Sequence, residues 1–403
     1  MKLWSAQMKA YKVNVYWFSF ALLSDGVFAY IPDTHITDGG LFIKPSLEIG
    51  VAYDDNIYNQ QHAGTSSGIM TLMPAINFKM DDGVNYYSFD MNAEKGTYEA
   101  SGEDDYTDGE LGLKAHLEPN DTHRVDASLK GEWLTESRGT GKSEGNFDRT
   151  DEPIKYGKNT FAASYEYGAL QTKGRLAFDL IFYEKEYRNF DDITRRSNYD
   201  SILLGSTFYY ATRANTDAFI EINAEKIGYD YNAPGELIRD SDVYTAFVGM
   251  QWEASAIVRG FVKIGGQAKE FDDSGREDFT GFSWNIGGVW RPLTYSKLTF
   301  STSQATDDPD VDGDYVLETK YNIDWKHDWT SYYYSSVGIY KYKDDYSGIS
   351  RVDDIYGLTL KFNYDVTQNI AVAVFGEWDR NQSTEAVFEY DKNVVGLSFT
   401  FTL

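Results

Sequence analysis

The sequence predicts an all-β fold, a single transmembrane antiparallel up-and-down β-barrel of about 18 strands. Three observations support this prediction. Apolar residues alternate with polar ones along most of the chain, the breaks between alternating segments are short and long in turn, and the last segment ends on an apolar side chain. Alternation alone also occurs in soluble sandwiches. The combination fits a closed sheet in a membrane, where only every second residue faces lipid.

The last segment has a large apolar residue at every second position: Val395, Leu397, Phe399, Phe401 and Leu403. The residues between them are small or hydroxylated, so a strand here has one apolar face and one polar face. We expect this segment to close the barrel by pairing with the first strand, because closure removes the exposed sheet edge. The alternative is an ordinary strand of a soluble sandwich.

Alternating segments recur from residue 41 to the C-terminus. They lie near 41–53, 69–80, 84–98, 106–117, 123–135, 159–168, 173–186, 198–211, 215–228, 242–253, 256–270, 280–291, 297–305, 315–328, 331–342, 352–365, 369–379 and 389–403. Even-numbered breaks are tight, such as Asp81-Asp82-Gly83, whereas odd-numbered breaks are longer and charged, such as 136–157. This parity is typical of outer-membrane barrels, with short periplasmic turns and long extracellular loops.

The N-terminus predicts a secretory signal peptide over residues 1–29. Lys2, Lys9 and Lys12 form a basic region, residues 13–23 are apolar, and Val-Phe-Ala at 27–29 is a candidate cleavage site. We expect cleavage after Ala29, a short periplasmic segment over 30–40 and the barrel over 41–403. The location would then be the outer membrane of a Gram-negative bacterium. A buried N-terminal helix is the alternative for the apolar stretch.

Composition narrows the function classes. The formal net charge of −26 argues against a nucleic-acid partner, because phosphate binding needs a basic surface. No cysteine is present, so disulfides and thiolate sites are excluded. The five histidines are scattered, and no HExxH, nucleophile elbow or phosphate-binding loop occurs. We therefore expect neither enzymatic activity nor a cofactor. The 32 tyrosines fit aromatic girdles at two membrane interfaces.

The face opposite the apolar one carries charged and aromatic residues on many strands. Charged side chains cannot pack as the dry core of a sandwich, but they can line a water-filled lumen. The candidate lumen residues are Arg124, Asp126, Lys130, Glu132, Arg175, Glu221, Arg259, Lys263, Glu318, Lys320, Tyr340, Lys361 and Glu377. Such a lining suits a hydrated sugar chain. The alternative is that these charges pair with one another and only keep the wall rigid.

One acidic run resembles the start of a calcium loop. Asp308, Asp310 and Asp312 precede Gly313 in the pattern D-x-D-x-D-G. The twelfth position is Thr319 instead of the expected glutamate, and strands are predicted on both sides where helices should flank the loop. We expect a solvated acidic external loop, with weak binding of a divalent ion as the alternative.

Residues 44–58 resemble the first strand and loop of the putative β-barrel porin 2 family of outer-membrane proteins. Pro-Ser-Leu at 45–47 and Tyr-Asp-Asp-Asn at 53–56 carry the likeness, followed by Met73-Pro74 in the next strand. The rest of the chain, from about 40 to 403, matches as a strand pattern. The resemblance implies an outer-membrane passage for an exopolysaccharide or capsular polysaccharide, such as a biofilm matrix polymer, working beside a periplasmic polysaccharide-export protein. It implies no catalytic residues.

Other functions fit the same strand number. A diffusion or uptake porin for oligosaccharides or small solutes is the main alternative, and an outer-membrane enzyme or an adhesion barrel fits less well. Uptake porins usually fold a long loop into the lumen, and Gly139, Gly141 and Gly145 would permit this in the 136–157 loop. The expected partners are outer-membrane lipid, a polysaccharide, a periplasmic export protein and the barrel assembly machinery.

Overall fold

The computed structural model describes residues 35–36, 40–213, 215–255 and 257–402. The predicted signal peptide over 1–29 and the terminal Leu403 lie outside these residues, so both expectations stay predictions.

Among the described residues, no helix has the length and apolarity needed to cross a membrane.

Eighteen antiparallel strands follow one another around a closed ring in chain order. They are β2 (Leu41–Asp54), β3 (Ser67–Asp81), β4 (Tyr86–Tyr98), β5 (Tyr106–Asn120), β6 (His123–Glu136), β7 (Ile154–Tyr167), β8 (Gly174–Tyr187), β9 (Tyr199–Arg213), β10 (Thr216–Tyr229), β11 (Ser241–Ser255), β12 (Val258–Phe271), β13 (Phe279–Leu293), β14 (Ser296–Asp307), β15 (Val316–Thr330), β16 (Tyr333–Tyr346), β17 (Val352–Asp365), β18 (Ile370–Ser383) and β19 (Tyr390–Thr402). A further two-residue strand, β1 (His35–Ile36), pairs with the start of β2. The predicted fold class is confirmed.

The last strand closes the ring. β19 pairs antiparallel with β2 over nine residue pairs, in a register that places Leu397 opposite Val51 and Phe399 opposite Ile49. Every barrel strand therefore has two neighbours, and no long edge is left to pair with another chain. The prediction that the C-terminal segment closes the barrel on the first strand is correct.

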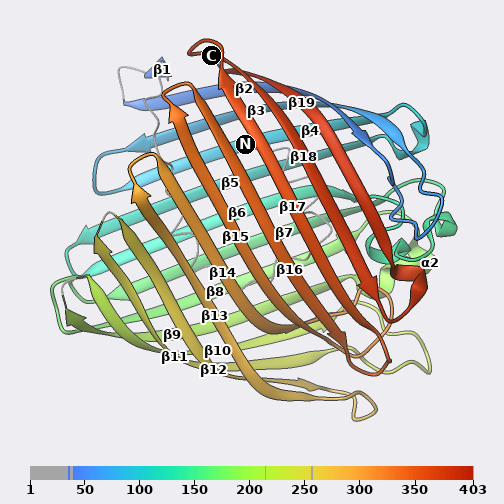
Figure 1. Cartoon of the computed structure of the whole chain (residues 1–403). Coiled ribbons are helices and arrows are strands. Elements are labelled where there is room, and N and C mark those ends of the chain that lie inside the picture. Colours follow the sequence, from blue (N-terminus) through green and yellow to red (C-terminus); the bar gives the residue numbers. More distant parts are fainter. Residues whose placement is uncertain (1–34, 37–39, 214, 256, 403) are drawn as a thin grey trace.

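Turns and loops separate to opposite ends of the barrel, as Figure 1 shows. The connection from β3 to β4 and every second one after it are tight, and they form one rim. The loop from β2 to β3 and every second one after it form the other rim. Short helical segments occur there, including α2 (Asp191–Thr194) and the 3-10 turns η4 (Gly141–Ser143), η5 (Phe147–Arg149) and η7 (Ala386–Phe388). We call the two ends the turn rim and the loop rim.

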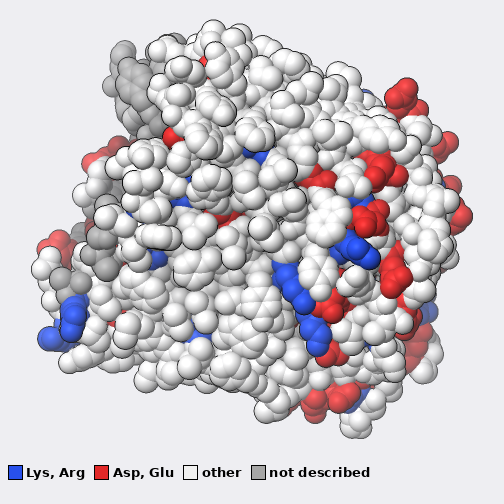
Figure 2. Space-filling view, viewed as in Figure 1, with Lys and Arg blue, Asp and Glu red and all other residues white. Residues whose placement is uncertain are grey.

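The two faces of each strand differ as the alternation predicts. On β19, Val395, Leu397, Phe399 and Phe401 are exposed on the outside, whereas Ser398 between them is 1% exposed and points inward. Figure 2 shows the consequence on the surface: one side of the barrel wall is largely uncharged, and the charged residues gather toward the loop rim. An apolar band of this kind is what lipid requires.

Exposed aromatic residues mark both borders of the apolar band. Those near the turn rim include Tyr167, Tyr210, Trp290, Trp329 and Tyr364, and those near the loop rim include Tyr53, Trp133, Tyr244 and Phe282. Tyrosine and tryptophan favour the interface because each has an apolar ring and a polar tip. The two belts account for part of the tyrosine excess.

Candidate functional site

The predicted lumen residues lie on the face opposite the exposed apolar side chains. On β6, for example, Lys130 and Glu132 alternate with the outward-facing Leu129 and Trp133. The same alternation places the whole set inside: Arg124, Asp126, Lys130, Glu132, Arg175, Glu221, Arg259, Lys263, Glu318, Lys320, Tyr340, Lys361 and Glu377. The residues are spread over eight strands and do not form a single cluster.

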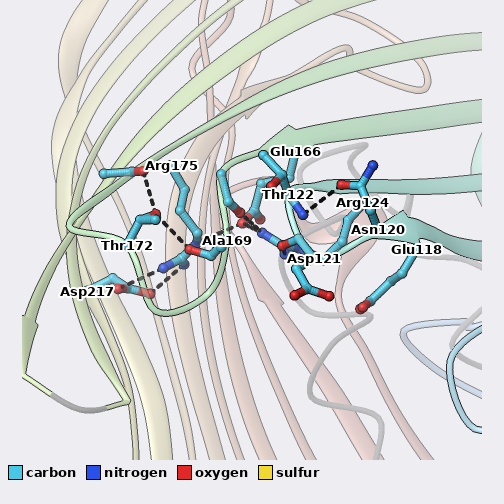
Figure 3. A network of polar contacts seen from close by, with 12 residues as sticks. Glu118, Asn120, Asp121, Thr122, Arg124, Glu166, Ala169, Thr172, Arg175 and Asp217 are labelled. Atoms are coloured by element: carbon cyan, nitrogen blue, oxygen red, sulfur yellow. Dashed lines mark hydrogen bonds and ion pairs between the residues drawn. The ribbon is translucent and has the colours of Figure 1, made fainter.

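Two lumen arginines share one carboxylate at the turn rim (Figure 3). Arg124 donates to Glu166 at 2.5 Å and to the main-chain oxygen of Gly168 at 2.6 Å. Arg175 donates to the same Glu166 oxygen at 2.7 Å and to both oxygens of Asp217, at 2.8 and 3.3 Å. The chain of ion pairs thus ties β6, β7, β8 and β10 together where the tight turns begin.

Further along the wall, Glu221 and Lys263 form a buried pair. The Lys263 ammonium is 2.8 and 3.0 Å from the two Glu221 oxygens and 5.0 Å from the centre of the Phe247 ring. Lys320 lies 2.5 Å from Glu318 in the same way. The charges of these residues are paired within the wall. This is the alternative stated above, in which paired lumen charges keep the wall rigid.

The β6 wall is more open to water. The side chains of Asp126 and Lys130 keep 43% and 42% of their surface exposed although both point into the barrel. Asp126 contacts His116 at 2.8 Å, and Lys130 contacts Glu132 at 2.9 Å. Exposure on the inner face means that this part of the lumen holds solvent.

The loop between β6 and β7, residues 137–153, crosses the mouth of the barrel; we call it the crossing loop. The ammonium of Lys142 donates a hydrogen bond to the main-chain oxygen of Asp310 in the β14–β15 loop. The β6–β7 and β14–β15 connections lie almost opposite one another in the ring, so this contact spans the opening. Lys142 and Ser143 are both buried there. The inward fold that the glycines were expected to permit is therefore present.

A second contact fixes the crossing loop to the far wall. Arg351, which directly precedes β17, is 2% exposed and donates to Glu144 at 2.7 Å and to Asp353 at 2.5 Å. Its guanidinium also lies 3.4 Å from the centre of the Phe388 ring. This arginine thus joins the crossing loop, the start of β17 and the β18–β19 loop.

Glycines make the docking sterically possible. Gly139, Gly141 and Gly145 all have positive φ, at 82°, 53° and 71°. A Cβ on Gly139 would lie 2.0 Å from the main-chain oxygen of Tyr58, and a Cβ on Gly145 would lie 2.7 Å from the Phe388 ring. Only glycine combines this backbone conformation with so close an approach.

The segment that carries the family resemblance supports the base of the crossing loop. Tyr58 stacks on Phe147 of the loop, with ring centres 4.6 Å apart. The guanidinium of Arg138, the second residue of the loop, donates to both oxygens of Asp104 at 2.7 Å and to the Tyr58 hydroxyl at 2.6 Å. Asn56 holds its own loop by donating to the main-chain oxygens of Gln60 and Asp391. The residues of the motif thus build the roof over the lumen.

The predicted calcium-loop aspartates have other partners. Asp308 accepts from Lys269 at 2.7 Å and from the Tyr229 hydroxyl at 2.5 Å. Asp310 belongs to the contact with Lys142, and its carboxylate is 4.0 Å from that ammonium. Asp312 follows in the same loop, and its side chain is exposed. In the described part of the chain, no group of three or more His, Cys, Asp or Glu side chains is arranged to hold a metal ion. The run is thus not solvated throughout as expected, because Asp308 is 8% exposed and packs against Lys269 and the Tyr229 hydroxyl, whereas Asp312 is exposed.

A cavity of about 220 Å³ lies directly beneath the crossing loop. Its lining includes Gly139 and Glu144 of that loop, Ile57 of the β2–β3 loop and Asp310 of the β14–β15 loop, so these loops form a roof. Twelve of the lining side chains are Asp or Glu and three are Lys, and five tyrosines and one phenylalanine stand among them. Of the predicted lumen residues, Glu318 and Glu377 line it. The cavity favours ligands with positive charge and hydrogen-bond donors.

The sequence analysis did not identify several residues of this site. Glu144, Asp344, Arg351 and Asp353 line or brace the cavity, yet none was among the lumen candidates. Asp344 falls beyond the predicted end of its strand at 342, whereas β16 continues to Tyr346. The usable signal was the alternation itself, since Asp344 is in phase with Tyr340 and Tyr342 on the inner face.

Glu144 has an unusual acidity for a loop carboxyl. Burial in the roof raises its pKa from 4.5 to about 7, although the neighbouring Arg351 guanidinium acts in the opposite direction. Its side chain keeps a quarter of its surface exposed. Glu144 therefore titrates near neutral pH.

Comparison with known proteins agrees with the barrel. The family described as "Putative beta-barrel porin 2" matches residues 34–403 of the chain. A search of curated proteins finds no match.

Similar solved structures include the siderophore receptor PirA from Acinetobacter baumannii, with a TM-score of 0.44, 7% identity, and 90% of this chain and 80% of that chain covered. Pseudomonas aeruginosa OccK3 (OpdO) has a TM-score of 0.45 and 12% identity, and the match covers 90% of this chain and 95% of that chain. Acinetobacter baumannii OccAB3 has a TM-score of 0.44 and 12% identity, and the match covers 90% of this chain and 99% of that chain. Likenesses of this strength carry no argument about function.

Proposed function

Because the chain belongs to the putative β-barrel porin 2 family, we propose that it is an outer-membrane porin through which an exopolysaccharide or capsular polysaccharide leaves the cell. It acts as a channel without catalytic activity, inserted in the outer membrane after removal of residues 1–29. The observation that carries the proposal is the hydrated inner wall of a closed barrel, in which Asp126 and Lys130 remain solvated.

The chemistry of the cavity supports a sugar as the passing molecule. Tyrosine rings offer flat apolar faces to the C–H faces of a sugar, and carboxylates accept hydrogen bonds from its hydroxyl groups. Tyr98, Tyr106, Tyr346 and Tyr390 stand among the carboxylates of the lining. A polymer that passes along such a wall replaces hydrogen bonds to water with hydrogen bonds of similar strength to the wall. It can therefore move along the lumen.

The crossing loop is the closed gate of this passage. Its contacts to Asp310, Arg351 and Phe388 span the mouth. A polymer can emerge only when these contacts open. The turn rim faces the periplasm, where a polysaccharide-export protein would hand over the polymer, while the barrel assembly machinery inserts the chain into outer-membrane lipid.

A second candidate function is diffusion or uptake of oligosaccharides or other small solutes. The inward fold of the crossing loop favours it, since a loop that narrows the lumen is a size filter for small molecules. The two functions share the barrel and differ in whether the loop must move out of the way.

The proposal is tested by deleting the gene and measuring polymer at the cell surface and in the periplasm. Export predicts loss of surface polymer with retention in the periplasm, restored by the wild-type chain expressed in trans. A strain without the protein that secretes normal amounts of polymer would refute export. If that strain instead grows poorly on an oligosaccharide, the uptake function holds.

A further inference from the structure

We propose that three carboxylates on neighbouring strands, Glu318, Asp344 and Asp353, bind the positively charged amino groups of an amine-bearing sugar. This inference rests on the proposed function and names the class of polymer that this lumen accepts. We call the three residues the carboxylate row. All three line the cavity beneath the crossing loop.

The register of the sheet places the row in a straight line. Glu318 on β15 lies directly opposite Asp344 on β16, and Asp344 lies directly opposite Asp353 on β17. Neighbouring strands are about 4.8 Å apart, so the row extends about 10 Å around the inner wall. Like charges directly opposite one another destabilise a sheet. A cation bound along the row would relieve this repulsion.

One oxygen of the middle residue, Asp344, has no hydrogen-bond donor among the described residues. Glu318 pairs with Lys320 at 2.5 Å and Asp353 pairs with Arg351 at 2.5 Å, so the cations stand at the two ends. Asp344 is 7% exposed, and among the described residues nothing donates to its Oδ1 atom. An unpaired buried carboxylate oxygen is costly, which makes it a place where a ligand gains free energy.

Two other buried oxygen atoms in this cavity also lack a hydrogen-bond donor among the described residues. Asp353 Oδ1 and Asn381 Oδ1 have no hydrogen-bond donor among the described residues, and their side chains are 1% and 3% exposed. Both residues line the same cavity as Asp344. A ligand that satisfies this wall must therefore bring donors. An ammonium group brings three donors and a positive charge, whereas a carboxylate or sulfate would be repelled.

The lining also favours a sugar over a bare ion. Tyr346, Phe375 and Tyr390 flank the carboxylates in the cavity and provide apolar surface that an ion cannot use. The spacing of the row spreads the oxygens along the wall instead of gathering them around one point. A chain with repeated amino groups, such as a glucosamine polymer, can contact successive members of the row.

The experiment uses the purified full-length protein in detergent and isothermal titration calorimetry. The probes are a glucosamine tetramer, its fully N-acetylated and therefore neutral counterpart, and calcium chloride. The test variant is Asp344→Asn, which keeps the shape of the side chain and removes its charge. The control is Asp328→Asn, at the other end of the inner face of β15, where Asp328 is paired with Lys326. A heat-dependent gel shift verifies that both variants fold.

We expect the glucosamine tetramer to bind at least about tenfold more tightly than the acetylated one, and Asp344→Asn to weaken it by about tenfold. Asp328→Asn should bind like the wild type, and binding should weaken as salt is added. Equal affinity for both tetramers, or an unchanged affinity in Asp344→Asn, overturns the proposal. Calcium binding that depends on Asp344 without amine binding overturns it in favour of a metal-cation site.

The export function and the amine-binding site can be refuted independently of each other. If the deletion strain secretes normally while the tetramer binds through Asp344, export is wrong and the carboxylate row is a site for a solute taken up by the second route. If deletion abolishes secretion while the amine-bearing tetramer does not bind, the porin exports a polymer of another class.

Discussion

The guanidinium of Arg351 lies 2.7 Å from the carboxylate of Glu144 and so joins the crossing loop to the β17 wall on the far side of the mouth. The same guanidinium holds Asp353 at 2.5 Å and covers the Phe388 ring. One side chain therefore connects three segments that are distant in sequence. If the barrel is a gated passage, this contact is a latch.

Replacing the latch arginine should open the mouth. Arg351→Gln leaves Glu144 and Asp353 without their cation, and removing one partner of a buried ion pair costs about 3–5 kcal/mol. We expect a several-fold higher single-channel conductance in planar bilayers. Arg380→Gln is the matched control, because Arg380 is exposed and 4.0 Å from its partner Asp391. Equal conductance of Arg351→Gln and the control would exclude the latch.

The latch should respond to pH near neutrality. The pKa of Glu144 is about 7 in the docked loop, against 4.5 for an ordinary glutamate. A group whose pKa is raised by docking takes up a proton when it docks, so acid stabilises docking. The closed state is then most stable below about pH 4.5 and loses that contribution as pH rises through 7. We expect open probability in bilayer recordings to rise between pH 5 and pH 8.

The variant Glu144→Gln is the control for this pH dependence. Its side chain stays neutral at every pH, so the rise in open probability should be largely absent. An unchanged pH profile in this variant would assign the effect to another group.

Glycine at position 139 should be essential for docking. Gly139→Ala combines an unfavourable φ of 82° with a Cβ that would lie 2.0 Å from the main-chain oxygen of Tyr58. Gly235→Ala has the same backbone strain, at φ 86°, but no atom within 4 Å of the added Cβ. We expect faster protease cleavage of the crossing loop in Gly139→Ala alone. Gly235 lies in the β10–β11 loop, so similar cleavage of the crossing loop in both variants would contradict the role of the contact with Tyr58.

The outer face of the closing strand should tolerate no charge. Leu397 is 40% exposed on the lipid side near the middle of β19. Leu397→Arg should lower the free energy of unfolding in lipid by about 2–4 kcal/mol, because the charge enters the apolar band. Ser128→Arg, on the solvated inner face of β6, should have a much smaller effect. Urea titration in liposomes measures both, and equal losses would contradict the assignment of faces.

The sequence predicted the barrel well because its constraints are local. Alternation within a strand assigns faces, and the alternation of short and long breaks assigns rims, so the strand count and the closing role of residues 395–401 are correct. Glycines at 139, 141 and 145 indicated that the loop could fold inward. The partner of each loop residue was not predictable, since the contact between Lys142 and Asp310 depends on which strands lie opposite one another in the closed ring.

Of the carboxylate row, Glu318 was predicted to face the lumen, but Asp344 and Asp353 were not. The predicted strand ended at 342, before the adjacent acids at 344 and 345. In a barrel the inner face stays polar beyond the membrane, and β16 continues to Tyr346. Register then places Asp344 between Glu318 and Asp353, which no single segment could indicate.

The central claim is that a water-filled lumen is held shut by the crossing loop, and planar-bilayer conductance tests it most directly. The wild-type protein is compared with a variant in which residues 138–152 are replaced by a short Gly-Ser linker. We predict small, infrequent conductance steps for the wild type and steps several-fold larger for the variant. Equal conductance of the two proteins, or no conductance from a folded variant, would contradict the claim.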